Sequence, residues 1–324
     1  IKDRLYSFGR VYNTISSIWQ LTYEVIDMKT MQRIKRVELP ASSIGIFNLT
    51  SFYVPSKPSF DGRYVYAAGV LDLGFRTEGG MITRDTEIVV FAVPVVSTVK
   101  VVDSSGRPLA GFSVRGVAGG YSLVNSTGAD GIAQLWGLAP DVVYVFDRDG
   151  RLVWYGDVAS LDATAVVHLV NSFSATSPLN LKGYLVLRGV PFLDGSTRDV
   201  AYNFKLTNGV LIVENDVPLD VAYPVEVYVT HVTLGGQEVP VRGGQFLVYR
   251  GTVADLTYGL DLTELGSVVS ISAVDSTGAP RADWTVQVLY GDIVVAEGKG
   301  SVNVVLPRTD VLDRPYTVRV VTNA

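Results

Sequence analysis

Apolar and polar residues alternate with a period of two along most of this chain. From Tyr223 to Val229 and from Tyr316 to Val321, every second residue is apolar or aromatic, as in a β-strand with one buried face. We find no stretch of a dozen residues with helical spacing. Glycine (32 residues) and proline (14 residues) fall between the alternating runs, where they favour turns. The pattern predicts an all-β fold.

A twelve-residue segment occurs twice. Residues 103–114 and 275–286 share six identical positions, among them Asp-Ser-x-Gly-x-Pro, and three more are conservatively changed. Each copy follows an apolar run, residues 99–102 and 271–274. A strand, a tight turn and a second strand open a small β-sandwich, so the repeat predicts a series of such modules.

A second recurring signal helps to place the module boundaries. An Asp stands three residues before a Tyr that opens a strand, at Asp61/Tyr64, Asp141/Tyr144, Asp220/Tyr223 and Asp313/Tyr316. In immunoglobulin-like sandwiches, such a Tyr bonds back to the backbone of the preceding corner. We expect four modules, over residues 1–94, 95–171, 172–266 and 267–324. Part of a β-propeller is an alternative for the first module, although one or two blades cannot close a ring.

Two of these modules carry further signals. Asn208-Gly209 in the third module predicts a type I′ hairpin turn. The fourth module is short for a complete sandwich, so we expect it to borrow a strand or to lean on a neighbour. Residues 267–324 are therefore the first place where we expect contact with another chain.

The second module contains three motifs in order. Residues 99–114 include an Asp-x-x-Gly-x-Pro-Leu-x-Gly turn, residues 126–135 a Thr-x-x-Asp-Gly-x-Ala-x-Leu hairpin, and residues 142–146 a strand with a central Tyr. This order is similar to the carboxypeptidase-regulatory-like and Cna-B-like families of prealbumin-type β-sandwiches. The fourth module resembles them in its first motif, but has residues 298–306 in place of the Asp-Gly hairpin. The first and third modules look generically immunoglobulin-like.

The resemblance implies a structural role and brings no catalytic residues. Such modules in series are frequent in bacterial and archaeal surface proteins, including surface-layer (S-layer) subunits, pilus proteins and adhesins. Some Cna-B-like modules form an internal Lys-Asn isopeptide bond assisted by a carboxylate. Lys100 and Asn171 would be the pair here, with Asp130 as the carboxylate because residues 95–171 contain no Glu. The alternative is an exposed Lys100 and a turn-forming Asp130.

Composition narrows the classes of protein. Hydrophobic residues make up 48% and charged residues 18% of the 324 residues, enough to build cores. The net charge of −5 comes without a basic patch, so we expect no nucleic-acid partner. The chain contains no Cys, which excludes disulfides and thiolate metal sites. No stretch qualifies as a membrane span, and the first residue, Ile1, suggests a chain processed after export.

Candidate chemistry is sparse. The two histidines, His168 and His231, are far apart in sequence, and no Gly-x-Ser-x-Gly elbow is present, so we expect no catalytic site. Asp147 and Asp149 resemble a fragment of a calcium loop but lack its closing Glu. They also suit a hairpin turn before Gly150. Calcium is the only cofactor that we consider, including at joints between modules.

Aromatic residues are candidates for sugar stacking. Neighbouring strand residues point to opposite faces, so only one of Trp154 and Tyr155 can face solvent on a sheet; Trp154 is the candidate. Trp284 occupies the place of Phe112 in the repeat, which favours a core role.

Two glycosylation sequons occur in the chain. They are Asn48-Leu-Thr50 and Asn125-Ser-Thr127, and either would carry a glycan only in an exported protein with the matching enzymes.

These observations favour a non-enzymatic, extracellular structural protein that assembles with copies of itself on the cell surface, as an S-layer subunit or a surface filament. Its positive mean hydropathy without a membrane span fits surface buried between subunits. One alternative is a monomeric adhesin or carbohydrate-binding stalk that contacts other surface proteins or glycans. Another is the accessory part of a larger secreted enzyme.

Overall fold

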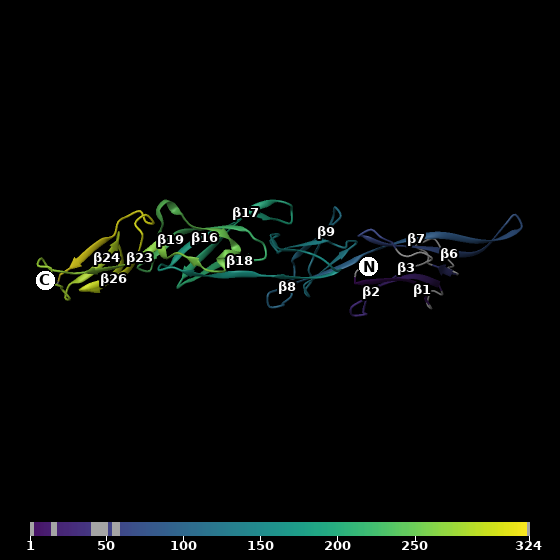
Figure 1. Ribbon diagram of the computed structural model, residues 1–324, viewed down its shortest axis with the longest axis horizontal. Coiled ribbons are helices and arrows are strands. Elements are labelled where there is room, and N and C mark those ends of the chain that lie inside the picture. Colours follow the sequence, from purple (N-terminus) through teal and green to yellow (C-terminus); the bar gives the residue numbers. More distant parts are fainter. Residues whose placement is uncertain (1–2, 14–17, 40–50, 54–58, 323–324) are drawn as a thin grey trace. The chain divides into compact units, whose positions relative to one another are not determined.

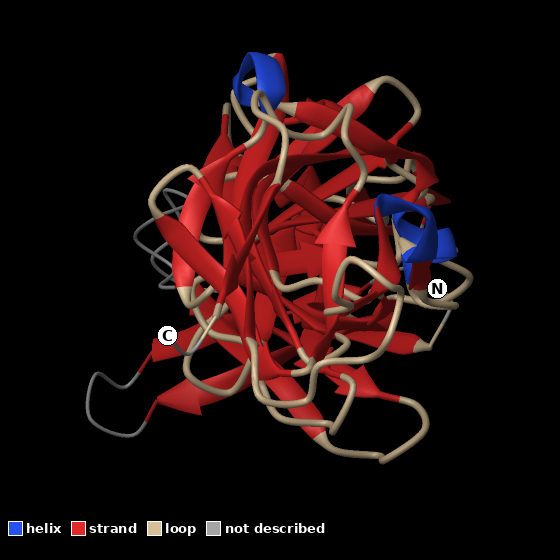
Figure 2. Ribbon diagram, turned by 90° about the vertical axis from the view of Figure 1, so that its left-hand side faces the viewer, coloured by secondary structure: helices blue, strands red, loops and turns tan. Residues whose placement is uncertain are grey.

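The computed structural model describes residues 3–13, 18–39, 51–53 and 59–322 (Figure 1). The described residues contain 27 β-strands, one four-residue α-helix and two 3-10 helices, and strands fill the view in Figure 2. The predicted all-β class is confirmed. The chain forms two compact units, residues 1–150 with 154–166, and residues 151–153 with 167–324. The finer division into four modules stays a prediction.

The first unit begins with two antiparallel sheets. One has the order β1-β2-β3, and in the other β6 pairs with β4 and β5 along one edge and with β7 along the other. Their bounds are β1 Arg4–Asn13, β2 Ile18–Asp27, β3 Arg33–Leu39, β4 Ser51–Tyr53, β5 Ser59–Phe60, β6 Tyr64–Glu78 and β7 Met81–Pro94. The β6–β7 hairpin is long because its two strands stay paired from Tyr64 and Pro94 to the turn after Glu78.

A two-sheet sandwich, which we call the central sandwich, follows, and all of its strand residues except Leu152, Val153 and Val167 belong to the same unit. Its sheets have the orders β10-β9-β12-β13 and β11-β8-β14. The bounds are β8 Val96–Asp103, β9 Ser113–Ala118, β10 Tyr121–Ser126, β11 Ile132–Trp136, β12 Val142–Phe146, β13 Leu152–Asp157 and β14 Asp162–Val167. Alternate residues fill the core, as the period-two pattern predicts: Val99, Val101, Val114, Leu135 and Val145 are at most 1% exposed.

The second unit is built around one large sheet. Its order is β20-β19-β16-β17-β18-β15-β22, with β21 also paired to β19, and only the short β15–β22 contact is parallel among the pairings described. The bounds are β15 Leu169–Thr176, β16 Leu181–Pro191, β17 Thr197–Thr207, β18 Val210–Pro218, β19 Pro224–Leu234, β20 Gln237–Pro240, β21 Phe246–Thr252, α1 Val253–Leu256 and β22 Leu260–Asp261. The 3-10 helices are Arg242–Gly244 and Thr263–Leu265.

The turn between β17 and β18 matches its prediction. Asn208 and Gly209 have φ values of 52° and 80°, and Thr207 pairs directly with Val210. Positive φ at both central residues is the hallmark of a type I′ turn, which Asn-Gly favours because neither position then carries a bulky side chain.

A smaller sandwich, the C-terminal sandwich, completes the second unit. Its sheets have the orders β23-β26 and β25-β24-β27. The bounds are β23 Gly266–Ser272, β24 Thr285–Tyr290, β25 Ile293–Lys299, β26 Ser301–Pro307 and β27 Thr317–Val321. Its core contains Val286, Val288 and Val304, while Tyr290, Val311 and Leu312 pack into the core of the large sheet. These three residues join the C-terminal sandwich to the core of the large sheet.

The repeated segment forms the same turn in both sandwiches. In the first copy, Asp103 Oδ1 accepts hydrogen bonds from the Ser105 N–H (2.9 Å), the Ser105 hydroxyl (2.7 Å) and the Arg107 N–H (2.9 Å). These bonds favour the ionised carboxylate and hold the pKa of Asp103 well below its usual range, with the Ser105 hydroxyl as the largest cause. Gly106 supplies the left-handed residue of the turn, with φ 81°.

The second copy repeats these contacts with different side chains. Asp275 Oδ1 accepts from the Thr277 N–H (2.9 Å), the Thr277 hydroxyl (2.6 Å) and the Ala279 N–H (3.1 Å). The pKa of Asp275 is again lowered, chiefly by the Thr277 hydroxyl. Gly278 has φ 83°. The two turns therefore share the Asp acceptor, the left-handed Gly and a hydroxyl that either Ser or Thr can supply.

A glycine carbonyl ties each first strand to a later hairpin. The Gly131 carbonyl accepts from the Val101 N–H, and the Gly300 carbonyl from the Ala273 N–H, both at 2.8 Å. A Cβ on Gly131 would lie 2.6 Å from the Val101 carbonyl oxygen. Gly300 thus takes the place of Gly131 although the Asp-Gly motif is missing around it.

Substitution of Gly131 tests how tight this approach is. Gly106→Ala meets no atom within 4 Å and should cost only the left-handed backbone, about 1–2 kcal/mol. Gly131→Ala, at φ 74°, should cost about 1–3 kcal/mol more because its Cβ overlaps the neighbouring strand. Urea unfolding of both variants measures the difference between their free energies of unfolding. Equal urea midpoints would show that the strand containing Val101 moves to make room for the added Cβ.

Candidate functional site

The predicted isopeptide residues belong to different units. Lys100 lies on β8 of the first unit opposite Ile132, whereas Asn171 lies at a bulge of β15 in the second unit. The strands beside β8 in the central sandwich are β11 and β14, whereas β15 pairs in the large sheet. Asp130 accepts the Ile132 N–H at 3.0 Å, before Gly131, which is the turn role expected as the alternative. The crosslink stays a prediction.

The two calcium candidates lie in the turn between β12 and β13. Asp147 is 6% exposed, and its Oδ1 accepts the Asp149 N–H at 2.9 Å. The Gly150 N–H donates to the Asp147 carbonyl at 3.0 Å, so the hairpin interpretation is confirmed. Within the described residues no three His, Cys, Asp or Glu side chains gather as a metal site would require.

The aromatic candidates on β13 differ in exposure. Trp154 is half-buried, and its ring covers Gly156, where a Cβ would lie 2.6 Å from the indole. Tyr155 is 55% exposed and stacks on Tyr144 at 6.3 Å between ring centroids. Trp284 packs partly buried against the core of the C-terminal sandwich, as its place in the repeat predicts.

The sequon residue Asn125 lies on the edge strand β10. Its side chain is exposed, with Nδ2 donating to the Gln134 carbonyl at 2.8 Å and Oδ1 accepting the Ser126 N–H at 2.9 Å. Glycosylation at this position stays a prediction. Asn48 lies outside the described residues.

Each of the two histidines has a polar partner close to its ring. His168 places Nδ1 2.7 Å from Asp220 Oδ1, and its backbone N–H donates to Oδ2 of the same carboxylate at 2.7 Å. His231 Nδ1 lies 3.1 Å from the Thr230 hydroxyl.

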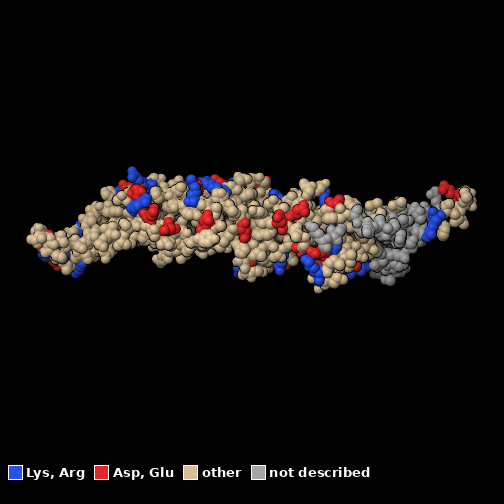
Figure 3. All heavy atoms as spheres, viewed as in Figure 1, with Lys and Arg blue, Asp and Glu red and all other residues tan. Residues whose placement is uncertain are grey.

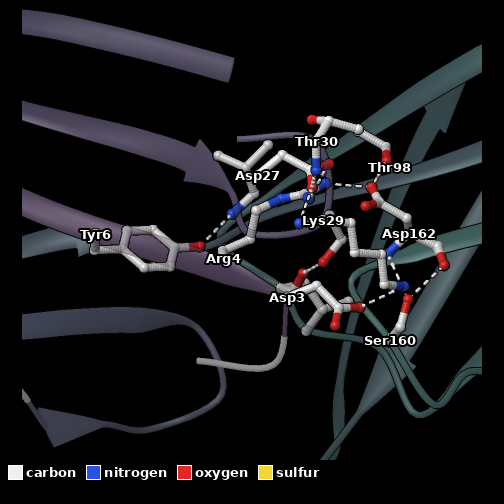
Figure 4. A network of polar contacts seen from close by, with 12 residues as sticks. Asp3, Arg4, Tyr6, Asp27, Lys29, Thr30, Thr98, Ser160 and Asp162 are labelled. Carbon is white, nitrogen blue, oxygen red and sulfur yellow. Dashed lines mark hydrogen bonds and ion pairs between the residues drawn. The ribbon is translucent and has the colours of Figure 1, made fainter. Parts of the chain in front are cut away.

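A buried arginine is the centre of the polar network in Figure 4. Arg4 is 2% exposed; its guanidinium lies 2.9 Å from Asp27 on β2 and also pairs with Asp162 on β14. The Thr98 hydroxyl donates to the same Asp162 carboxylate. The network connects the first sheet to the central sandwich and is structural, because a buried guanidinium requires such partners.

The outer face of the large sheet carries a surface hollow of about 590 Å³. Two lysines and two glutamates are among its lining residues: Lys182, Lys205, Glu214 and Glu238. Lys182 pairs with Glu238, and charges of both signs are mixed on the face of this unit seen in Figure 3. The hollow therefore offers no excess of one charge to select a ligand.

The C-terminal sandwich has an unpaired edge on each of its two sheets. Its strands β23, β24, β25, β26 and β27 pair as β8, β9, β10, β11 and β12 do in the central sandwich. Strands β13 and β14 have no counterparts among the described residues. Since β13 pairs with β12, and β14 with β8, the edges that lack a neighbour present in the central sandwich are those of β27 and β23. We call this the open side.

The burial of equivalent residues measures what the open side lacks. On β12, Val143 and Val145 are both 0% exposed. On β27, Val318 and Val320 occupy the matching register positions, opposite Val288 and Val286, but are 47% and 43% exposed. Covering each of them would contribute on the order of 1 kcal/mol.

On the neighbouring sheet, β23 turns Val269 and Ile271 toward the core of the C-terminal sandwich. Val268 is 69% exposed because it lies on the opposite face of the strand. The uncovered core residues of the open side are therefore those of β27, and this edge is the best candidate for a functional surface.

The sequence indicated the C-terminal module, but it did not show which residues of that module are exposed, and it did not indicate the role of Arg4 in the first unit. The module's short length pointed to a missing strand, yet the exposure of Val318 and Val320 could be read only from the pairing with β24. Arg4 was overlooked altogether. The available signal was its position two residues before Tyr6, on the same face of an alternating strand.

Comparison with known proteins adds little. No protein family matches the chain, and no curated protein matches it. Among solved structures, the Bacillus anthracis TIE protein is similar over 99% of this chain and 73% of its own, with 10% identity and a TM-score of 0.22. That similarity is too low to bear on fold or function. In the described residues, no helix is long and apolar enough to cross a membrane.

Removal of one partner of Arg4 should destabilise the first unit. We expect Asp162→Asn to cost about 1.5–3 kcal/mol, the usual value for a hydrogen bond to a charged group. Glu24→Gln is the matched control, because among the described residues Glu24 forms ion pairs with Arg33 and Arg36 at the surface, and its substitution should cost less than about 1 kcal/mol. Thermal unfolding measures both, and equal effects would contradict the role given to Arg4.

Tyr316, beside β27, should make stability sensitive to alkali. Burial raises its pKa to about 12, and its hydroxyl donates to the Pro307 carbonyl at 3.2 Å, the backbone contact predicted for this Tyr. An unfolded Tyr has a pKa of about 10, so the contribution of Tyr316 is complete below pH 10 and is lost as the pH rises through 12.

Comparison with Tyr316→Phe isolates this contribution. Between pH 8 and pH 11, the urea midpoint of the unchanged protein should fall more than that of the variant. An equal fall of the urea midpoint in both proteins would show that the pKa of Tyr316 is not raised in the folded protein.

Proposed function

We propose that this chain is a non-enzymatic structural protein of the cell exterior that assembles with copies of itself, as an S-layer subunit or a surface filament. The observation that carries the proposal is the open side of the C-terminal sandwich. Unpaired strand edges with exposed valines are sites where another strand adds by backbone hydrogen bonds.

The edge strand β27 lacks the usual protection against such pairing. Its sequence, Thr-Val-Arg-Val-Val, contains one charged residue and no proline, and all five residues are exposed. Edges in monomeric proteins are commonly blocked by lysines, prolines, bulges or covering loops. An edge left unprotected supports a role in assembly.

The repeated module supports the same proposal. The Asp103 and Asp275 turns are maintained by hydrogen bonds within each turn, so their recurrence serves the sandwich and not a ligand. The resemblance to modules of prokaryotic surface proteins agrees with a location outside the cell.

Self-association tests the proposal directly. Light scattering of the purified protein over a range of concentrations, with and without calcium, should show species larger than a monomer, and electron micrographs should show a lattice or fibre. A monomer under every condition, with no ordered assembly in the micrographs, would contradict the proposal.

A further inference from the structure

We propose that β7 of a second copy adds to the free edge of β27 and so forms the joint between subunits. The inference rests on the proposed self-assembly and names the surface that would carry it. It requires a donor strand with a free edge, apolar residues at alternate positions and a charge that suits Arg319.

Strand β7 has a free edge. It pairs with β6 along one side only in the described part of the chain, and it is 14 residues long. Beyond the contact of β4 with residues up to Asp72, the β6–β7 ribbon pairs only with itself among the residues that the structure describes. A two-stranded ribbon is marginally stable in water, so further pairing would stabilise it.

The apolar residues of β7 have the spacing that the open side requires. Ile88 and Val90 are 77% and 64% exposed and lie two positions apart, so they share one face of the strand. Val318 and Val320 have the same spacing on β27 and lack cover. A strand that pairs with β27 and turns Ile88 and Val90 inward would add apolar residues beside the two valines.

The charges of the two strands are complementary. Positions 85 and 87 of β7 directly precede the apolar pair Ile88 and Val90 in the sequence. The sequence has Asp and Glu at these positions, opposite in sign to the exposed Arg319. Opposite charges on adjacent strands favour their pairing, and like charges disfavour it.

The geometry of such a joint determines the kind of assembly. Donor and acceptor are different surfaces of the chain, so each copy that gives β7 still has its own β27 edge available. Heterologous contacts of this kind build rings or open-ended assemblies rather than closed symmetric dimers. This agrees with a lattice or a filament.

Engineered cysteines test the joint without interference, because the chain contains no Cys. Val318→Cys and Val320→Cys are each mixed with Ile88→Cys or Val90→Cys under mild oxidation, with one partner carrying a mass tag. Facing residues on paired strands lie close enough for a disulfide. Antiparallel pairing predicts the 318–90 and 320–88 combinations, and parallel pairing predicts 318–88 and 320–90.

Val210→Cys serves as the control, because Val210 is similarly exposed (45%) but lies on β18. The expected result is a mixed disulfide between β27 and β7 variants in several-fold excess over any disulfide with the control. Assembly without that disulfide would overturn this joint and leave the proposed function standing, and disulfides only between two β7 variants would point to a symmetric contact instead.

Two further outcomes would also overturn the joint. Val318→Cys that resists thiol reagents in a monomer would show that the edge is covered within its own chain. A protein that never assembles would remove the proposed function as well.

A charge exchange gives an independent test. Arg319→Glu should abolish assembly at a concentration where the unchanged protein assembles, because it places like charges on adjacent strands. Adding Glu87→Arg in the same chain should restore assembly. Normal assembly of Arg319→Glu, or a loss of assembly that Glu87→Arg does not restore, would overturn the proposed pairing of β7 with β27.

Discussion

Every strand of a β-sandwich needs a neighbour for its backbone N–H and C=O groups and a cover for its apolar face. The central sandwich meets this requirement with seven strands in two sheets. Its inner valines are fully buried as a result. The C-terminal sandwich has the same first five strands and fails the requirement on one side. This difference between the two sandwiches is the reason for proposing a role in assembly, since no group of reactive side chains among the described residues suggests another function.

Short sequence motifs correctly predicted the turns and contacts that form between residues close together in the sequence. The Asp-Ser-x-Gly-x-Pro turn forms twice because its Asp accepts hydrogen bonds from residues two and four positions later. Asn208-Gly209 forms its hairpin turn for a similar reason, since both residues accept positive φ. Tyr316 reaches the backbone only nine residues back. Each of these contacts joins residues less than ten positions apart, so the local residue pattern was enough to predict it.

Contacts between distant segments were not predictable in this way. Arg4 can be buried because it forms an ion pair with Asp162, which lies 158 residues later in the chain. No local sequence pattern predicts that pair. Asn171 was expected to close the module of residues 95–171, yet it lies on β15, which pairs with β18 in the large sheet. Gly300 replaced Gly131 without the surrounding motif. Which strands pair, and which glycine they approach, depends on the whole fold.

The half-exposed valines of β27 also bear on energetics. A sandwich that leaves part of its core uncovered gains stability from whatever binds there, by an amount that grows with the logarithm of the partner's concentration. If the partner is another copy, folding of the C-terminal sandwich and growth of the assembly become one linked equilibrium. Its melting temperature would then depend on protein concentration, and dilution alone would loosen this end of the chain.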